Sequence, residues 1–291
     1  MFRYGCHHMS APLSRVMMRR PGDNLRKADP AAWNYNHLFD PGRAMAEYQQ
    51  LVDIVQDFGA EIIWADSDGD DSADGMFVKD ASTVTRSGAI LFSMGKGLRG
   101  GEPATHEKAY RDADIPILGR VNGQGRIEGG DLIWLDEKTL AVGVGFRSNR
   151  EGVRQMSALL HPRGVEVFGF DLPYWRGEAF CLHLTSFMSP LNEKTYIAYM
   201  PLMPAGFWLL LKERGVAVIN SPETEFHDSH GQNVNVLPLS ETECVMIDGF
   251  PRTRAAIEAA GVSVRAFSGD ALCMACEGGP TCLTNPIYRN V

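Results

Sequence analysis

Residues 51–64 read LVDIVQDFGAEIIW, in which an amphipathic helical stretch ends at Gly59 and a short β-branched strand follows. The same order recurs in MSALLHPRGVEVF at residues 156–168, in FWLLLKERGVAVI at 207–219 and in AAIEAAGVSV at 255–264. Glycine suits the end of each helical stretch, because a left-handed backbone there costs least without a Cβ. A weaker fifth copy at 104–118 lacks that glycine. The chain is therefore predicted to repeat one unit at intervals of roughly fifty residues.

Pairs of strands around a tight polar turn follow several of these copies. Apolar residues alternate on both sides of turn residues in segments 82–91, 131–142, 192–199 and 234–246, which is typical of β-hairpins. One such unit cannot bury its apolar faces alone, whereas five units in a ring can. We therefore predict an α/β fold, a five-bladed α/β propeller of ββαβ repeats that forms a single domain over residues 1–291. Two separate α/β domains are the alternative.

The repeat also aligns one position at the start of each hairpin. Residues 80, 183, 235 and 282 lie 19 to 21 residues after the four helix-end glycines, and they are Asp80, His183, Asn235 and Cys282. Glu128 stands just before the hairpin of the irregular unit. Equivalent positions in a closed ring point toward its axis. A nucleophile, a base and two carboxylates are therefore expected to converge.

A cysteine, a histidine and carboxylates at one place favour nucleophilic catalysis. The thiolate attacks an electrophilic carbon, the imidazole protonates the leaving amine and then activates water, and a carboxylate fixes the tautomer of the ring. Taken singly, a cysteine or a histidine is as readily a buried packing residue, so the repeat carries the argument. We predict Cys282 as the nucleophile and His183 as its proton-transfer partner.

Composition and charge narrow the classes of function. The 291 residues carry a net charge of −8, which provides no basic surface for nucleic acid or an acidic membrane. No apolar run approaches the roughly 18 residues of a membrane span, and the N-terminus lacks the apolar segment of a secretory signal. Six cysteines in so long a chain do not resemble a disulfide framework. We therefore expect a cytoplasmic protein that binds neither nucleic acid nor membrane.

Seven short motifs stand in a fixed order along the chain. They are VMMRRPG at 16–22, DGMFVKD at 74–80, EGGD at 128–131, GFRSN at 145–149, HLT at 183–185, NVL at 235–237 and GPTCLTNP at 279–286. Together they resemble the guanidine-modifying enzymes of the pentein fold, which include dimethylarginine dimethylaminohydrolase, arginine deiminase and the glycine/inosamine amidinotransferases. The resemblance covers essentially the whole chain. It implies a cysteine-dependent hydrolase that acts on a guanidino group.

The resemblance also implies roles for the converging residues. Cys282 would form a covalent thiouronium adduct on the guanidine carbon, and His183 would act as general acid and then as general base. Glu128 would hold the guanidinium and the neighbouring imidazole by charge-assisted hydrogen bonds, and Asp80 would bind the guanidinium nitrogens. Water would then release a ureido product, after ammonia or an alkylamine has left.

Three further residues are similar to the family's contacts with the amino-acid end of the substrate. Arg99 and Arg147 resemble clamps for an α-carboxylate, a role that suits the rigid fork of arginine, and Asp74 resembles the residue near the α-amino group. We therefore expect a small guanidino substrate and neither a cofactor nor a metal. A homo-oligomer is compatible with the exposed outer helices of such a ring.

Two positions depart from the family's patterns. Deiminases and amidinotransferases carry an aspartate two residues after the histidine, and Thr185 in that place favours the dimethylarginine hydrolase branch. That branch usually carries an acid just before the motif aspartate, whereas Lys79 here resembles the deiminases. The two positions favour different branches. An N-substituted arginine, a ureido compound or another amidine all stay open as substrates.

Other interpretations stay open beside the hydrolase. An amidinotransferase would pass the amidino group to an acceptor amine, and a non-catalytic relative would use the ring as a binding scaffold. Cys273 and Cys276 have the spacing of one zinc-ligand pair, but a fourth ligand is missing, so passive thiols or an oxidation-sensitive loop are expected there. The segment GKGLRGG at 95–101 lacks the ending of a phosphate-binding loop, and we interpret it as a mobile substrate lid.

Overall fold

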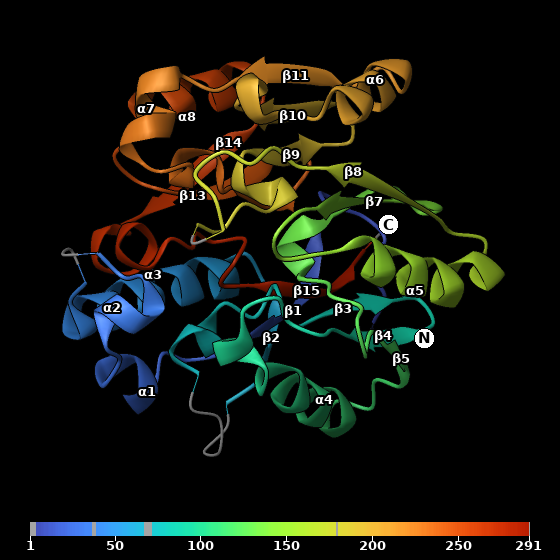
Figure 1. Cartoon of the computed structure of the whole chain (residues 1–291). Coiled ribbons are helices and arrows are strands. Elements are labelled where there is room, and N and C mark those ends of the chain that lie inside the picture. Colours follow the sequence, from blue (N-terminus) through green and yellow to red (C-terminus); the bar gives the residue numbers. More distant parts are fainter. Residues whose placement is uncertain (1–3, 37–38, 67–71, 179, 291) are drawn as a thin grey trace.

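The structure is a computed structural model that describes residues 4–36, 39–66, 72–178 and 180–290. It contains five three-stranded sheets. In each sheet two strands form an antiparallel hairpin or pair, and a third strand joins in parallel after a helical crossover. This is the predicted ββαβ unit. The five helices of the crossovers lie around the outside of the molecule, and the sheets face its centre (Figure 1).

The units follow one another along the chain. The first contains β15 (Asn285–Arg289), β1 (Leu13–Met18), α3 (Pro41–Asp57) and β2 (Glu61–Trp64). The second contains β3 (Ser82–Thr85), β4 (Gly88–Leu91), α4 (Glu102–Asp112) and β5 (Ile117–Arg120). The third contains β6 (Leu132–Asp136), β7 (Thr139–Val144), α5 (Arg150–Leu160) and β8 (Glu166–Asp171). The fourth contains β9 (Met188–Asn192), β10 (Thr195–Ala198), α6 (Ala205–Glu213) and β11 (Ala217–Asn220). The fifth contains β12 (Leu237–Ser240), β13 (Glu243–Ile247), α8 (Pro251–Ala259) and β14 (Ser263–Phe267).

The ring closes through strands from opposite ends of the sequence. β15 pairs antiparallel with β1, so that Pro286 lies opposite Val16, and β1 pairs in parallel with β2. β15 also packs beside β3, and β12 packs beside β9. The first strand of each hairpin is therefore the inner strand of its unit. The predicted five-bladed α/β propeller is confirmed.

The predicted hairpins and helix-to-strand junctions are present. The four hairpin segments form β3–β4, β6–β7, β9–β10 and β12–β13. The four helix-end glycines all have a positive φ, which is 92° at Gly59 and 86° at Gly261. In the fifth copy Asp114 takes the equivalent place with a φ of 57°. Aspartate tolerates this left-handed conformation better than most residues with a side chain, which explains how that unit ends without a glycine.

Some elements were not predicted. β1 and β15 form the unit that closes the ring, and three short helices lie outside the repeat, namely α1 (Asp23–Arg26), α2 (Pro30–Trp33) and α7 (Glu223–Asp228). The cores lie between each sheet and its outer helix. In the third unit, for example, Met156 and Leu160 of α5 pack with Leu140 and Val142 of β7.

Among the described residues, none of the helices combines the length and the apolar character that crossing a membrane would require.

Candidate active site

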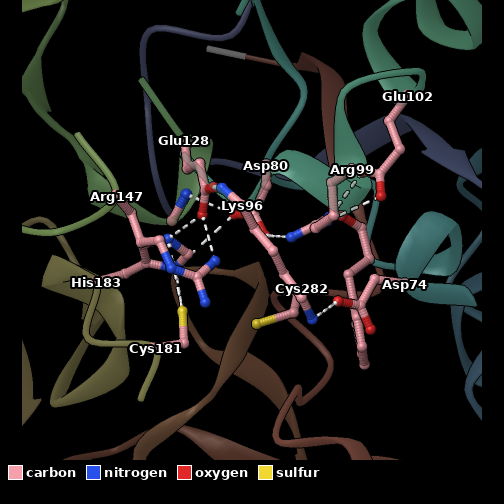
Figure 2. Close-up of polar contacts among 12 residues, drawn as sticks. Asp74, Asp80, Lys96, Arg99, Glu102, Glu128, Arg147, Cys181, His183 and Cys282 are labelled. Carbon is pink, nitrogen blue, oxygen red and sulfur yellow. Dashed lines mark hydrogen bonds and ion pairs between the residues drawn. The ribbon is translucent and has the colours of Figure 1, made fainter. Parts of the chain in front are cut away.

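A cavity of about 890 Å³, part of it open to solvent, lies where the inner strands begin. We call it the front cavity. Each of the five units contributes the residue or short turn just before its inner strand, which are Asp80, Glu128, His183, Asn235 and Cys282. Four of these line the front cavity, and Glu128 lies directly behind His183. The convergence expected from the repeat is therefore present (Figure 2).

His183 is held rigidly at the start of the turn Leu184–Ser186. Its backbone N–H donates to the Ser186 hydroxyl at 2.9 Å, and its Nε2 lies 2.8 Å from Oε2 of Glu128. The ring also packs against Gly130, where a Cβ would lie only 2.3 Å from Nδ1. Only glycine allows this approach. Nδ1 in turn lies 3.9 Å from Oδ1 of Asp80.

The surroundings of His183 favour its protonated form. Burial alone would lower the pKa of the imidazole, but the Cys181 sulfur, which lies 3.4 Å from Nδ1, and the Asp80 and Asp131 carboxylates outweigh burial and raise the pKa well above its usual value. The pKa of the neighbouring Glu128 is shifted in the opposite direction. Burial would raise its pKa, but the hydrogen bond and the charge of His183, together with Arg147, lower it. The two groups form a charged, hydrogen-bonded pair.

Glu128 is saturated with donors. Its Oε1 accepts from the backbone N–H groups of Gly95 and Lys96 at 2.9 and 3.1 Å, and its Oε2 accepts from Arg147 Nη1 at 3.1 Å as well as from His183. The glycine-rich segment 95–101, interpreted above as a substrate lid, thus holds the Glu128 carboxylate in this structure.

Cys282 lies ahead of β15, opposite His183 in the front cavity. Asn235 Nδ2 donates to its Sγ at 3.1 Å, and Asn235 Oδ1 accepts from the Thr281 backbone N–H at 3.0 Å. Burial, followed by the charge of Asp80, raises the pKa of the thiol to about 11, although Asn235 and His183 act in the opposite direction. In the empty cavity Cys282 is therefore a thiol at neutral pH.

Asp80 and Arg99 form a buried pair. Asp80 accepts from the Gly130 N–H at 3.0 Å through Oδ1 and from Arg99 Nη1 at 2.6 Å through Oδ2. Arg99 also donates twice to Glu102, at 2.8 Å each, and once to the Phe77 carbonyl at 2.9 Å. Its side chain is only 4% exposed. Arg99 lines the front cavity, but its donors are engaged by these partners, so the geometry favours a role in positioning Asp80 over the expected clamp of a substrate carboxylate.

Asp74 and Arg147 occupy other parts of the cavity wall. Asp74 accepts from the Tyr35 hydroxyl at 2.8 Å and from Lys96 Nζ at 2.7 Å, and Lys96 lies over the ring of Trp33. Arg147 follows β7 and reaches Glu128, with 12% of its side chain exposed. The figure shows Arg147 beside His183 and Cys181, and Asp74 beyond Cys282 (Figure 2).

Several residues of the site had no predicted role. The count along the repeat found the position of Asn235 but assigned it nothing, although an amide there is the natural donor to a cysteine in the next unit. Cys181 and Lys96 come from loops that have no counterpart in the repeat, so the sequence held no signal for them.

Lys79 and Thr185, the two positions that depart from the family's patterns, lie differently relative to the front cavity. Lys79 does not line the front cavity, and its backbone N–H donates to the Cys282 carbonyl at 3.1 Å. Thr185 lies at the floor of the cavity and donates to the Gly130 carbonyl at 2.7 Å. The side chain of Lys79 therefore does not face a cation bound in the front cavity, and the two positions still favour different branches.

Two groups of side chains in the described part of the chain could hold a metal ion: Glu128 with Cys181 and His183, and His8 with Glu193 and Glu241. The first group is already occupied by the His183 and Arg147 contacts of Glu128. Neither group contains Cys273 or Cys276, which are buried free thiols.

The comparisons with known proteins agree with this geometry. Residues 69–210 match the family model of arginine deiminase. An N(G),N(G)-dimethylarginine dimethylaminohydrolase of Streptomyces coelicolor is 29% identical over 66% of this chain and 70% of its own length. Both are hydrolases of C–N bonds in amidines, and the enzyme class predicted from the sequence agrees with them.

Solved structures share the fold. Dimethylarginine dimethylaminohydrolase from Pseudomonas aeruginosa, in complex with citrulline, superposes with a TM-score of 0.76 at 22% identity, over 94% of this chain and 99% of that one. An amidinotransferase of saxitoxin biosynthesis from Microseira wollei gives a TM-score of 0.77 at 13% identity, over 100% and 98% of the two chains. With five ββαβ units in a ring and a cysteine, a histidine and two carboxylates at its centre, the chain has the pentein fold of these structures.

Proposed function

We propose that this protein hydrolyses the guanidino group of an arginine-like small molecule through a covalent adduct on Cys282. One observation carries the proposal: Cys282, His183, Glu128 and Asp80 come from four different units and meet at one cavity. A merely structural role would not require a buried thiol to face a charged histidine–glutamate pair. The six free thiols suit a reducing compartment, so the proposed setting is the cytoplasm.

The substrate itself is proposed to activate the nucleophile. The negative charge of Asp80 is one of the causes that keep the pKa of Cys282 high. A guanidinium bound to Asp80 offsets that charge and adds a cation next to the sulfur. Both effects favour the thiolate, so the nucleophile forms when the substrate is in place.

The bond changes then follow from the positions of the groups. The Cys282 thiolate attacks the guanidino carbon, and the protonated His183 gives a proton to the departing nitrogen as the C–N bond breaks. Ammonia or an alkylamine leaves, and a thiouronium remains on the sulfur. His183, now neutral, takes a proton from water, whose oxygen attacks the same carbon. Expulsion of the thiolate gives the ureido product.

The outer part of the front cavity suits the amino-acid end of such a substrate. Asp74 can accept from an α-ammonium group, and its partner Lys96 and the partly exposed Arg147 can donate to an α-carboxylate. Arg99 is not part of this clamp, because its donors are used by Glu102, Asp80 and Phe77. The proposed substrate is therefore a zwitterionic amino acid with a guanidino end.

A substrate panel tests the proposal. Arginine, methylated arginines, citrulline and guanidino acids are assayed for ammonia, methylamines and ureido product. Cys282→Ser is expected to lose turnover by at least about a thousandfold, because the sulfur forms the intermediate. Cys6→Ser is the matched control: Cys6 donates to the His8 carbonyl outside the front cavity, a bond that serine can also make.

Mass spectrometry of the quenched reaction should show the adduct on the peptide that contains Cys282. Unchanged turnover in Cys282→Ser would show that the catalytic assignment is wrong. Transfer of the amidino group to an added amine, in place of ureido product, would identify an amidinotransferase.

A further inference from the structure

A second cavity, of about 510 Å³ including its opening, lies behind the catalytic residues. We call it the rear cavity. Lys79 and Thr281 line it, whereas their chain neighbours Asp80 and Cys282 line the front cavity, and Thr185 borders both. Successive side chains of an extended segment point to opposite sides. The two cavities are therefore the two faces of the same backbone segments.

The rear cavity has an unusual charge. Lys79 and Arg289 both line it, and the described residues around it include no aspartate or glutamate. His8, a third basic group, is paired with Glu193 at 2.6 Å. In the front cavity Arg99, Arg147 and Lys96 each have a carboxylate partner. In a chain with a net charge of −8, two unpaired cations at one place require an explanation.

Lys79 is only partly exposed, and no carboxylate pairs with it among the described residues, although the charge of Asp80 acts on it from the front side. Within residues 4–36, 39–66, 72–178 and 180–290, no hydrogen bond or ion pair reaches its ammonium group. Burial is the main cause of the lowered pKa of Lys79, and the charge of Arg289 acts in the same direction, which places the two cations near each other. A buried charge without a partner is costly.

Arg289 is 3% exposed and is held in place by the backbone. Its Nη1 donates to the Ala11 carbonyl at 2.6 Å and its Nη2 to the Pro238 carbonyl at 2.8 Å. Nε is buried and has no hydrogen-bond partner among the described residues. Carbonyl oxygens fix the direction of the guanidinium but do not neutralise it. The fork is therefore a preformed, uncompensated cation at the wall of the rear cavity.

The remaining walls are apolar or carry hydroxyl groups. Trp134, Leu237 and Pro238 give the rear cavity an apolar side, and Thr83 and Thr284 add polar atoms. A hydrated inorganic anion would gain little from the apolar side. A carboxylate with a short hydrocarbon tail uses both kinds of wall.

We propose that the rear cavity binds a small aliphatic monocarboxylate, whose carboxylate group lies between Lys79 and Arg289 and whose tail packs against Trp134, Leu237 and Pro238. The site is separate from the proposed guanidine chemistry. It does touch the catalytic residues through the backbone, because the Lys79 N–H donates to the Cys282 carbonyl.

Calorimetric titration of the full chain carrying Cys282→Ser tests this without any turnover, so its outcome is independent of the proposed function. Sodium butyrate is the probe, with butyramide, n-butylammonium and inorganic phosphate as matched compounds. Butyrate is expected to bind, and the other three to bind at least about tenfold more weakly. Lys79→Met should weaken butyrate binding by at least about tenfold, the loss expected for one charge-assisted hydrogen bond.

Lys96→Met is the control, because Lys96 is the lysine of the front cavity. The protein that carries Lys96→Met should bind butyrate as tightly as the parent protein with Cys282→Ser alone. Loss of binding in Lys96→Met with retention in Lys79→Met would place the anion in the front cavity and overturn the proposal. Stronger binding of phosphate than of butyrate would also overturn it.

Thermal unfolding of the unsubstituted protein gives a second measurement that needs no variant. Butyrate should raise the unfolding midpoint relative to butyramide, because a ligand of the folded state stabilises it. Lys79→Met should unfold at the same or a higher temperature than the parent, since it removes an unpaired buried charge. Equal midpoints with butyrate and butyramide would contradict the proposal.

Discussion

The contact between Asn235 and Cys282 shows how a single residue sets the reactivity of the site. The thiol is partly buried and lies near Asp80, and both facts oppose ionisation. Asn235 is the neutral group that opposes them, because its amide donates to the sulfur at 3.1 Å and stabilises the thiolate more than the thiol. Its place in the fifth unit is equivalent to the places of Asp80, His183 and Cys282.

Replacing Asn235 should therefore make Cys282 less reactive. The pKa of the thiol is already raised to about 11, so the thiolate fraction increases with pH up to that value and is small at pH 9. Asn235→Ala removes a cause that lowers the pKa, and alkylation of Cys282 by iodoacetamide at pH 9 should become about tenfold slower. The rate is followed by mass spectrometry of the peptide that contains residue 282.

Asn122→Ala provides the comparison, because Asn122 is an exposed asparagine far from any cysteine contact. Its alkylation profile should match that of the parent. An unchanged rate in Asn235→Ala would show that the amide does not support the thiolate.

At the scale of elements, the helix-end positions explain why the repeated unit could be predicted from the sequence. The pattern of a helix, a glycine and a strand is local, and each copy corresponds to a helix and the strand that follows it. The same holds for the hairpins. β15 is different: it begins with Asn285-Pro286 and pairs with β1, which lies at the other end of the sequence. A pairing between such distant segments leaves no local pattern to read.

Gly59 allows a measurement of the free energy that a side chain costs at a helix end with a positive φ. Its φ is 92°, and a Cβ there would meet no atom within 4 Å. Gly59→Ala should therefore lower the free energy of unfolding by about 1 kcal/mol through the backbone alone, measured by urea denaturation. Gly22→Ala is the control, since Gly22 also has free space around it but a φ of −105°. Equal effects of the two substitutions would contradict a conformational cause.

For the whole molecule, two strands from distant parts of the sequence, β15 and β1, share one repeat position. β15 and β1 take the places that the two strands of a hairpin take in the other units, and the turn between them is missing. The Gly5 N–H donates to the Ile287 carbonyl at 2.8 Å, so the two described ends lie side by side.

A circular permutant tests this equivalence. A chain that starts at Thr242, ends at Glu241 and joins residue 291 to residue 1 by a short Gly/Ser linker breaks an exposed hairpin turn. It should fold with one cooperative urea transition, as expected for the single domain predicted over residues 1–291. A permutant cut between Met156 and Ser157, inside α5, should be much less stable. Separate transitions in the first permutant would favour two domains.

The sequence predicted the ring and the residues that meet at its axis, because both follow from one repeated pattern. It did not predict what Arg99 does. The partners of this arginine are Glu102, the first residue of α4, and Asp80, which lies in the loop before β3, and their geometry depends on how the segments between them fold. Cys181 and Lys96 were missed for the same reason.

The hydrogen bond from Thr185 to the Gly130 carbonyl has a consequence for the order of events in the proposed reaction. It lies at the floor of the front cavity, where Thr185 borders both cavities. In the proposed reaction, substrate, departing amine and incoming water would then all use the opening of the front cavity to solvent. The amine has to diffuse out before water can reach the adduct, so an amine accumulating in solution would compete with water for the same carbon and slow its own release.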